Sequence, residues 1–254
     1  MSDARTQSAI ADPTRRPHAV LDLRSRVWKA QKIERLLALD VGKKPIRLLE
    51  IGCGSGGIAH YFGMHPSGRF SVHAVDVVDS RLLTEGFEFA TVGGTELPFP
   101  ADSFDIVLSN HVIEHVGDES QQARHLSELK RVLAPEGQGY LAVPNRWMLI
   151  EPHFRLAFLS WLPKSWRSAY VRLMGRGEYY DCEPLELGQC ERLLTQAGFE
   201  FENVCVAAAR LTLSIEQPGS LKSKILDRMP DGILDAMTPI IPTLMYRLRH
   251  GEAG

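Results

Sequence analysis

The sequence has no hydrophobic run long enough to cross a bilayer and no excess of charge of either sign. A membrane-spanning helix needs about 20 apolar residues in succession, and the first twenty residues also lack the apolar stretch of a signal peptide. Lys and Arg total 29 against 31 for Asp and Glu, a formal net charge of -2, so nothing favours a polyanion such as nucleic acid. We therefore expect a soluble, cytoplasmic protein that does not bind nucleic acid.

Cysteine is also scarce. The four cysteines, Cys53, Cys182, Cys190 and Cys205, lack the paired spacing of a zinc site and the density of a disulfide scaffold. Free thiols in a reducing compartment are expected, and no metal site. The rest of the composition, 44% apolar and 24% charged over 254 residues, suits a single domain with a substantial core.

Strand-like and helix-like segments alternate between residues 45 and 145. Short apolar runs of strand type lie at 46–51, 71–78, 87–92, 105–109 and 139–143, and stretches with helical spacing lie at 57–64 and 119–133. Such alternation predicts an α/β fold with a mostly parallel sheet and helices on both faces. The ligand is expected at the carboxyl ends of the strands.

Four regions follow from this pattern. Residues 1–17 are predicted to form a polar, flexible arm, and residues 18–144, which begin with a helix at 19–40, the ligand-binding core. Residues 145–186 break the alternation and are expected to form a helical cap insertion. Residues 187–254 are expected to complete the sheet, with a helix at 187–197, a strand at 201–211, an irregular or helical stretch and a final strand at 243–249.

The segment 48–57, LLEIGCGSGG, is a buried strand that runs into a glycine-rich bend and a helix. Glycines let the chain turn sharply and let a ligand lie against bare main chain, and the start of a helix offers unpaired N–H groups. Gly52, Gly54 and Gly57 satisfy the G-x-G-x-x-G spacing of dinucleotide folds, with Asp76 about 20 residues later for a ribose. One interpretation of the bend is therefore a binding site for a nicotinamide dinucleotide cofactor.

A second spacing fits the same bend and is supported by further motifs. Glu50, Gly52, Gly54 and Gly56 have the form E/D-x-G-x-G-x-G, and Asp76 ends the strand candidate VHAVD. The stretches TELPFPADSFDIV (95–107), SNHVIEHV (109–116) and LKRVLAPEG (129–137) follow in order. This series resembles class I S-adenosylmethionine-dependent methyltransferases, in particular the small-molecule subgroup of quinone, sterol and sugar methyltransferases.

The resemblance implies S-adenosylmethionine as the cofactor, no metal, and a Rossmann-like, mostly parallel seven-stranded sheet. It places Glu50 and the loop main chain at the amino-acid end of the cofactor and Asp76 at its ribose hydroxyls. The subgroup's acid after the third strand is missing from residues 92–95, so the adenine is expected on main chain or on the residues near it. The full set of expected cofactor contacts is Glu50, Gly52, Cys53, Gly54, Gly56, Asp76, Val77, Glu96, Leu97 and Asn110.

Three histidines are candidates for a general base. A sulfonium methyl is already an electrophile, so the protein must chiefly align donor and acceptor and exclude water. A hydroxyl acceptor also has to lose its proton, a task for which histidine is suited near neutral pH. His111 directly follows the fourth strand, His115 lies about one helical turn further, and His153 opens the insertion. The alternatives are structural roles: Glu114 and His115 would form a pocket-floor or capping pair, and His153 would anchor a loop.

The insertion combines aromatic and basic residues. Between residues 152 and 177 there is no Asp or Glu, whereas Arg and Lys occur five times. One interpretation is a small cap with an aromatic core and a solvated basic rim. The others are a lid over the acceptor, or contact with an anionic membrane surface at the inner face of the membrane, which would suit a glycolipid acceptor.

The sequence thus predicts S-adenosylmethionine-dependent methyl transfer to a small-molecule or glycolipid acceptor, with oxygen as the favoured atom. Two alternatives remain open at this point. One is an NAD(P)-dependent oxidoreductase that uses the other glycine spacing. The other is a non-catalytic subunit that binds the cofactor and serves a partner.

Overall fold

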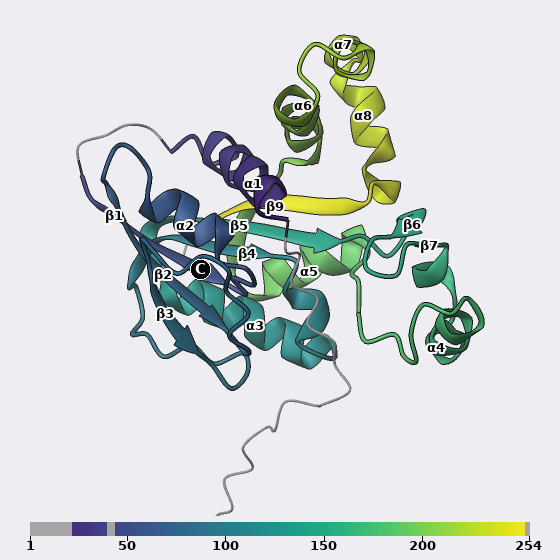
Figure 1. Ribbon diagram of the computed structural model, residues 1–254, viewed down its shortest axis with the longest axis horizontal. Helices are drawn as coiled ribbons and strands as arrows, with labels where there is room; N and C mark the ends of the chain where they lie inside the picture. Colours follow the sequence, from purple (N-terminus) through teal and green to yellow (C-terminus); the bar gives the residue numbers. More distant parts are fainter. Residues whose placement is uncertain (1–21, 40–43, 252–254) are drawn as a thin grey trace, which may run out of the picture.

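The structure, a computed structural model, describes residues 22–39 and 44–251. Figure 1 shows a twisted sheet with helices on both faces and two lobes that project from it. The arm predicted at residues 1–17 lies outside the described residues.

Seven strands form one sheet in the order β3-β2-β1-β4-β5-β9-β8. The strands are β1 (Ile46–Ile51), β2 (Phe70–Asp76), β3 (Glu88–Thr91), β4 (Phe104–Asn110), β5 (Leu133–Pro144), β8 (Phe199–Asn203) and β9 (Thr243–His250). The pairs from β3 to β5 are all parallel, and β9 alone runs antiparallel to both of its neighbours. The predicted α/β, mostly parallel seven-stranded sheet is confirmed.

Each face of the sheet has its own core because successive side chains of a strand point to opposite faces. Leu48 and Tyr140 belong to the core beneath α1 (Leu23–Leu36), α2 (Gly57–Gly63) and α6 (Cys205–Glu216). Their neighbours Leu49 and Leu141 belong to the core beneath α3 (Glu119–Val132) and α5 (Leu187–Gln196). Within residues 22–39 and 44–251, no helix has the length and apolar content needed to cross a membrane.

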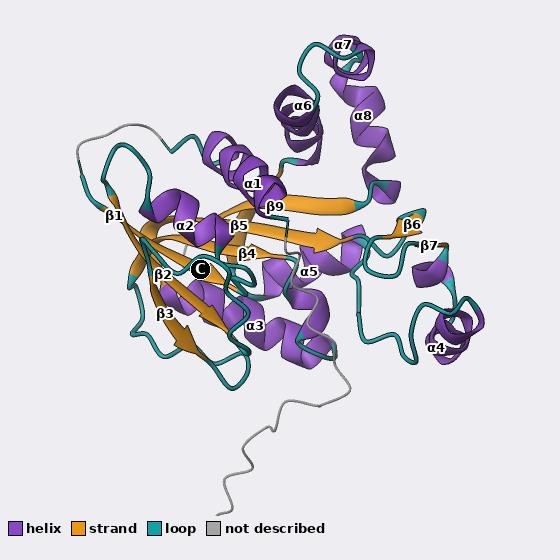
Figure 2. Cartoon of the chain, in the orientation of Figure 1, coloured by secondary structure: helices purple, strands orange, loops and turns teal. Residues whose placement is uncertain are grey.

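Two lobes project beyond the sheet (Figure 2). The cap lobe, residues 145–186, contains the hairpin β6 (Ile150–Glu151) and β7 (Leu156–Ala157), the short helix η2 (Leu159–Trp161) and α4 (Lys164–Leu173), so the predicted helical cap is helical only in part. Buried residues from both halves, including Leu159 and Val171, give it a small core of its own. The second lobe, residues 217–242, contains α7 (Leu221–Arg228), α8 (Asp231–Met237) and η3 (Thr238–Ile240).

The strand expected at residues 201–211 is wrong beyond Asn203. There β8 ends, and α6 begins at Cys205. The side-chain oxygen of Asn203 accepts a hydrogen bond from the N–H of Cys205 at 3.1 Å, which satisfies one of the unpaired donors of the first helical turn. Three alanines at 207–209 then favour a helix. Local helix propensity outweighs the apolar alternation that suggested a longer strand.

The crossover from β2 to β3, residues 77–87, contains no helix and packs on α2 instead. The N–H groups of Leu82 and Leu83 donate to the carbonyl of Ser55 at 3.0 and 3.2 Å. Ser55 lies in the glycine bend just before α2. At the other end of α2, the backbones of Gly63 and Gly86 lie so close that a Cβ at residue 63 would be 1.8 Å from the carbonyl oxygen of Gly86. The contact therefore requires glycine at position 63.

We expect Gly63→Ala to lower the free energy of unfolding by about 3 kcal/mol, because an added methyl must displace backbone in a closely packed contact. Urea unfolding followed by circular dichroism measures the change. Gly188→Ala in α5 is the matched control, since a Cβ there would meet nothing within 4 Å and alanine is the better helix former. Equal stabilities of the two variants would contradict the close packing of the crossover on α2.

Candidate active site

The glycine bend after β1 is fixed by its neighbours in the sheet. The N–H groups of Gly52 and Cys53 both donate to the carbonyl of Val75, at 2.8 and 3.2 Å, so the bend rests on β2. Gly56 precedes α2 with a φ of 77°, in the left-handed region that side chains disfavour. A Cβ there would also lie 2.4 Å from the carbonyl oxygen of Leu83. The chain is thus bare main chain where α2 begins.

Asp76 closes β2 beside this bend. Its Oδ2 accepts a hydrogen bond from the N–H of Gly54 and its Oδ1 one from the N–H of Val77, both at 2.8 Å. The side chain is half-buried, so its carboxylate is held in place yet still reached by solvent. This carboxylate at the end of β2 is compatible with the predicted ribose contact, which stays a prediction.

Glu50 lies beneath the bend with 2% of its surface exposed. Its Oε2 accepts a hydrogen bond from the N–H of Ala59 in α2 at 2.8 Å, a structural contact that the sequence interpretation did not foresee. Burial raises the pKa of Glu50 to about 8, although the bond from Ala59 and the charge of Arg26 oppose the shift. The positive charge of Arg26 therefore does not fully offset the cost of burying an ionised Glu50.

A pH-dependent stability follows from this buried carboxyl. The pKa of Glu50 is about 8 in the folded protein and about 4.3 in an unfolded chain. Its contribution to stability is thus fully present below about pH 4 and is lost as the pH rises through 8.

The variant Glu50→Gln tests this dependence, because its amide keeps an oxygen for the N–H of Ala59 but cannot ionise. Between pH 6 and pH 8 the variant should therefore lose about 2 kcal/mol less stability than the natural chain. Urea unfolding at the two pH values measures this difference, and equal losses would contradict the raised pKa.

Helix α1 brings two cations to the site that the sequence interpretation missed. Arg26 packs its stem on the start of α2, since a Cβ at Gly57 would lie 2.6 Å from the Cβ of Arg26. Its Nε is buried and has no hydrogen-bond partner among the described residues. Lys29, one turn later, interacts electrostatically with Glu114, and burial lowers the pKa of Lys29 to about 7. From the sequence, the i, i+3 spacing could have shown that Arg26 and Lys29 share one face of the helix. It could not have shown that this face lies near the carboxyl ends of the strands.

His111 and His115 meet at one buried carboxylate. His111 follows β4 in a left-handed conformation, with a φ of 59°, and its Nδ1 lies 3.4 Å from Oε1 of Glu114. The Nε2 of His115 lies 3.8 Å from the same oxygen, and the side chain of Glu114 is completely buried. Burial lowers the pKa of His111 despite this contact.

His153 joins the same cluster from the cap lobe. Its ring centroid lies 5.4 Å from that of His115, and its Nδ1 donates to Oε1 of Glu151 at 2.8 Å. The other oxygen of Glu151 accepts from the N–H of Phe154 at 2.7 Å. Burial alone would lower the pKa of His153, but the bond to Glu151 and the neighbouring carboxylates raise it. The structure therefore brings the three predicted bases together and places Glu114 beside His115, as the alternative structural interpretation of that pair expected. It also adds Glu151, which was not predicted.

The cluster also contains groups of the kind that bind cations. The ligand atoms of Glu114, His115 and His153 lie within 4.8 Å of one another, as do those of two sets that include Cys182. Two of these side chains, His153 and Glu151, are hydrogen-bonded to each other. A histidine held by a carboxylate in this way is the arrangement of a proton-transferring pair. Proton transfer is the chemistry that the observed bonds support.

The remaining predicted cofactor contacts differ in accessibility. Val77 and Glu96 are exposed, Asn110 is half-buried at the end of β4, and Cys53 is buried. Leu97 is 5% exposed and belongs to the core beneath α3.

Leu97 is held in that core from α3. Its N–H donates to Oε2 of Glu128 at 2.9 Å, and Arg131 donates to its carbonyl at 3.1 Å. Side chains of α3 thus hold the start of the motif at 95–107 in place. The contact of Leu97 with adenine stays a prediction.

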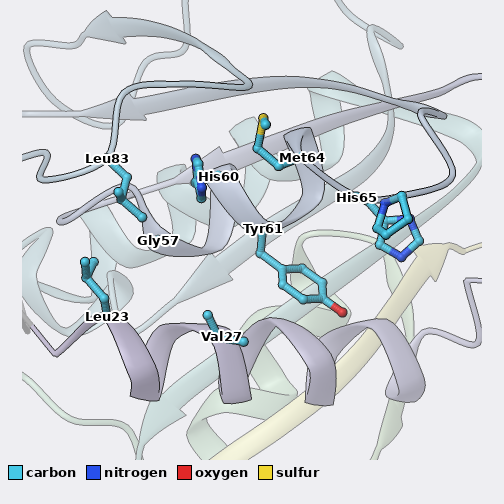
Figure 3. A pocket seen from close by; sticks show the side chains of 9 residues that line it. Leu23, Val27, Gly57, His60, Tyr61, Met64, His65 and Leu83 are labelled. Carbon is cyan, nitrogen blue, oxygen red and sulfur yellow. The ribbon is translucent and has the colours of Figure 1, made fainter.

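A cavity of about 450 Å³ opens between α1 and α2. Figure 3 shows the ring of Tyr61 extending from α2 towards α1, where Val27 lies. The lining reaches Gly57 at the start of α2 and Leu83 in the crossover from β2 to β3, but it includes neither Asp76 nor any residue of the histidine cluster. We do not assign this cavity to the candidate active site.

Comparison with known proteins identifies a recognised domain that includes the glycine bend, Asp76, His111 and Glu114 but not His153. Residues 49–141 match the family described as "Methyltransferase domain". Ajmaline N-methyltransferase of Rauvolfia serpentina is 33% identical over 104 residues, which cover 37% of this chain and 35% of that protein. Ubiquinone biosynthesis O-methyltransferase of Caulobacter sp. (strain K31) is 34% identical over 113 residues, 40% of this chain and 42% of that protein. The matched part thus spans well under half of either relative.

Solved structures show the same fold over most of the chain. A phosphoethanolamine N-methyltransferase 2 of Haemonchus contortus, in complex with S-adenosyl-L-methionine, has a TM-score of 0.52 at 21% identity and covers 87% of this chain and 52% of that chain. A SAM-dependent methyltransferase from Methanosarcina mazei has a TM-score of 0.51 at 18% identity, with 85% and 98% covered. Likeness at these identities establishes the Rossmann-like fold.

Proposed function

We propose that this chain, whose residues 49–141 match a methyltransferase domain, transfers a methyl group from S-adenosylmethionine to a hydroxyl oxygen of a small-molecule or glycolipid acceptor. The domain match supports the predicted enzyme class, a methyltransferase, and with it S-adenosylmethionine as the cofactor. The observation that carries the proposal for oxygen is the hydrogen-bonded pair of His153 and Glu151 beside His115. We place the activity in the cytoplasm.

The residues present fit the cofactor. S-adenosylmethionine supplies an electrophilic methyl on a positively charged sulfur, together with an ammonium and a carboxylate. Glu50 is a buried carboxyl whose ionised form the nearby positive charge does not fully stabilise, so a cationic ligand would find an acidic partner there. Arg26 carries a buried donor without a partner among the described residues, which suits a carboxylate. Asp76 and the main chain of residues 52–56 would hold the ribose and the amino-acid end.

The proposed mechanism assigns the proton of the acceptor to His153. Because Nδ1 donates to Glu151, Nε2 is the ring nitrogen that takes up a proton. Glu151 fixes the tautomer and stabilises the imidazolium that forms, so it acts as a positioning residue. His111 is less suited, since burial lowers its pKa and weakens it as a base.

A histidine base distinguishes oxygen from nitrogen acceptors. A neutral amine attacks with its own lone pair, whereas a hydroxyl gains nucleophilicity as its proton is removed. The relatives include N- and O-methyltransferases, so their names favour neither atom. The histidine cluster at the end of β4 favours oxygen.

Methyl transfer can be tested without knowing the acceptor. The full chain is incubated with a bacterial metabolite and lipid extract and with S-adenosylmethionine that carries a trideuterated methyl group, and products are analysed by mass spectrometry. We expect a labelled product with a new methyl ether, absent when the protein is omitted. If the protein binds S-adenosylhomocysteine but labels nothing in extracts rich in hydroxyl compounds, the non-catalytic subunit becomes the better account. A labelled methylamine would overturn the choice of oxygen.

A further inference from the structure

The cap lobe exposes large apolar side chains on its hairpin and on α4. Trp166 is 66% exposed, Leu173 82% and Ile150 62%. Leu149, Phe158 and Trp161 are also exposed, with the rings of Phe158 and Trp161 in edge-to-face contact at 5.2 Å. We call these six residues the cap surface: Leu149, Ile150, Phe158, Trp161, Trp166 and Leu173. Exposed apolar groups of this size, gathered on one small lobe, mark an interaction site.

Two local features indicate that this exposure is built into the lobe. On α4, Trp166 and Leu173 are seven residues apart and therefore lie on the same side of the helix, whereas Val171 is fully buried. Phe158 has a φ of 57°, a conformation that is strained for a bulky side chain. This conformation does not bury the residue, because Phe158 remains half exposed.

The central part of the lobe, residues 152–177, also carries positive charge and contains no Asp or Glu, although acidic residues flank it on both sides. Arg155, Arg172 and Arg176 are exposed, and within the described ranges none of them forms an ion pair. The other two cations of residues 152–177 are engaged: Lys164 pairs with Glu183 at 2.8 Å, and the buried Arg167 donates to backbone carbonyls. Arg172 also donates to the carbonyl of Glu178 at 2.9 Å, but this bond leaves its charge unpaired. Three exposed guanidinium groups without a carboxylate partner thus accompany the cap surface.

From this combination we infer that the cap surface docks on an anionic lipid bilayer, at the inner face of the cytoplasmic membrane. Tryptophan and phenylalanine insert readily at the lipid–water interface, aliphatic side chains bury among acyl chains, and arginines bind lipid phosphates. A nucleic acid would satisfy the arginines but would leave Leu149, Ile150 and Leu173 without a suitable partner.

The second lobe lacks this combination and provides a comparison. It exposes Leu221 (74%), Ile225 (53%) and Ile233 (52%). Its charges are mixed, however, because acidic residues such as Asp227 and Asp231 alternate with its lysines and arginines. It presents apolar groups without an excess of positive charge.

Docking would bring the candidate base close to the lipid. The hairpin that contributes Ile150 to the cap surface also carries Glu151, and the N–H of Phe158 donates to the carbonyl of Leu149 at 2.8 Å across it. His153 lies in the turn of the same hairpin. An acceptor carried by a lipid would therefore meet the site at the membrane. This last step rests on the proposed function, whereas the docking itself does not.

Sedimentation of the full chain with vesicles tests the inference. Vesicles of phosphatidylcholine mixed with phosphatidylglycerol are compared with vesicles of phosphatidylcholine alone. The triple variant Arg155→Gln, Arg172→Gln, Arg176→Gln is expected to bind the anionic vesicles on the order of 100-fold more weakly, at roughly five-fold for each cation near an anionic surface. Phe158→Ser with Trp166→Ser should weaken binding by at least about ten-fold.

Controls separate docking from folding and from the proposed chemistry. Ile233→Ser in the second lobe removes an apolar side chain of similar exposure, and Arg124→Gln removes an exposed arginine from α3. Both should bind like the natural chain, and binding of S-adenosylhomocysteine should be retained in all variants.

The inference is overturned if the natural chain does not sediment with anionic vesicles, or if Ile233→Ser weakens binding as much as the cap variants. It is also overturned if the cap variants only convert a dimer to a monomer, which would identify a second copy of the chain as the occupant. Loss of vesicle binding with retained methyl transfer to a soluble acceptor supports the docking surface independently of the proposed function.

Discussion

Asp76→Ala is expected to raise the dissociation constant for S-adenosylhomocysteine by about 100-fold or more. A carboxylate that binds both ribose hydroxyls makes two charge-assisted hydrogen bonds, each contributing about 1.5–3 kcal/mol, and about 2.7 kcal/mol corresponds to a factor of 100. Isothermal titration calorimetry measures the constant. Asp76→Asn should show an intermediate loss, because its amide retains one acceptor oxygen.

The matched control for this variant is Asp79→Ala. Asp79 lies three residues further on, is exposed, and forms an ion pair with Arg81 at 2.8 Å, so it tests the loss of a nearby carboxylate that has no proposed ligand. We expect its affinity for S-adenosylhomocysteine to be close to that of the natural chain. Circular dichroism establishes that Asp76→Ala still folds. A folded Asp76→Ala variant with natural affinity would contradict the role of this residue at the ribose.

His153→Ala is expected to lower the rate of methyl transfer by about 100-fold to 10,000-fold, the range that a general base contributes. The dissociation constant for S-adenosylhomocysteine should stay unchanged, because His153 comes from the cap lobe and not from the glycine bend. The labelled-methyl assay measures the rate under single-turnover conditions. His111→Gln and His115→Gln, which remove the two neighbouring rings, should have smaller effects.

Glu151→Gln provides a readout that a merely structural role would not change. The carboxylate of Glu151 raises the pKa of His153, and the base acts only when it is unprotonated, so activity should rise with pH through that pKa. Removing the charge lowers the pKa, and the acidic limb of the pH profile should move to lower pH. The maximal rate should also fall, because the ring loses its orientation. A fall in rate with an unmoved pH profile would assign Glu151 a structural role only, and a larger effect at His111 would transfer the role of base to that residue.

The sheet could be predicted because most of its strands have a local pattern of apolar residues that indicates a strand. The run at 46–51 is apolar and bounded by glycine and proline, and the structure forms β1 over the same residues. Where two tendencies compete, the prediction fails: the apolar alternation after Phe201 suggested a strand, but the alanine-rich stretch that begins at Cys205 becomes α6. The length of a strand is thus less well determined than its presence.

The parts of the site that were missed depend on contacts between distant segments. Arg26 reaches the glycine bend only because α1 packs across α2, and Glu151 acquires its role only when the cap lobe brings His153 to His115. Neither residue belongs to a motif, and no local spacing distinguishes it from other charged residues. Glu50, by contrast, was predicted as a site residue, but its bond to Ala59 shows a structural task as well.

The central claim is that the glycine bend and Asp76 bind S-adenosylmethionine. The most direct measurement is the thermal unfolding of the natural chain with S-adenosylhomocysteine, with NAD and with NADP, each at the same excess. A ligand at 100 times its dissociation constant adds about 2.7 kcal/mol to the stability of the folded state. We predict a raised unfolding midpoint with S-adenosylhomocysteine and none with either nicotinamide. Stabilisation by NAD or NADP alone would contradict the account.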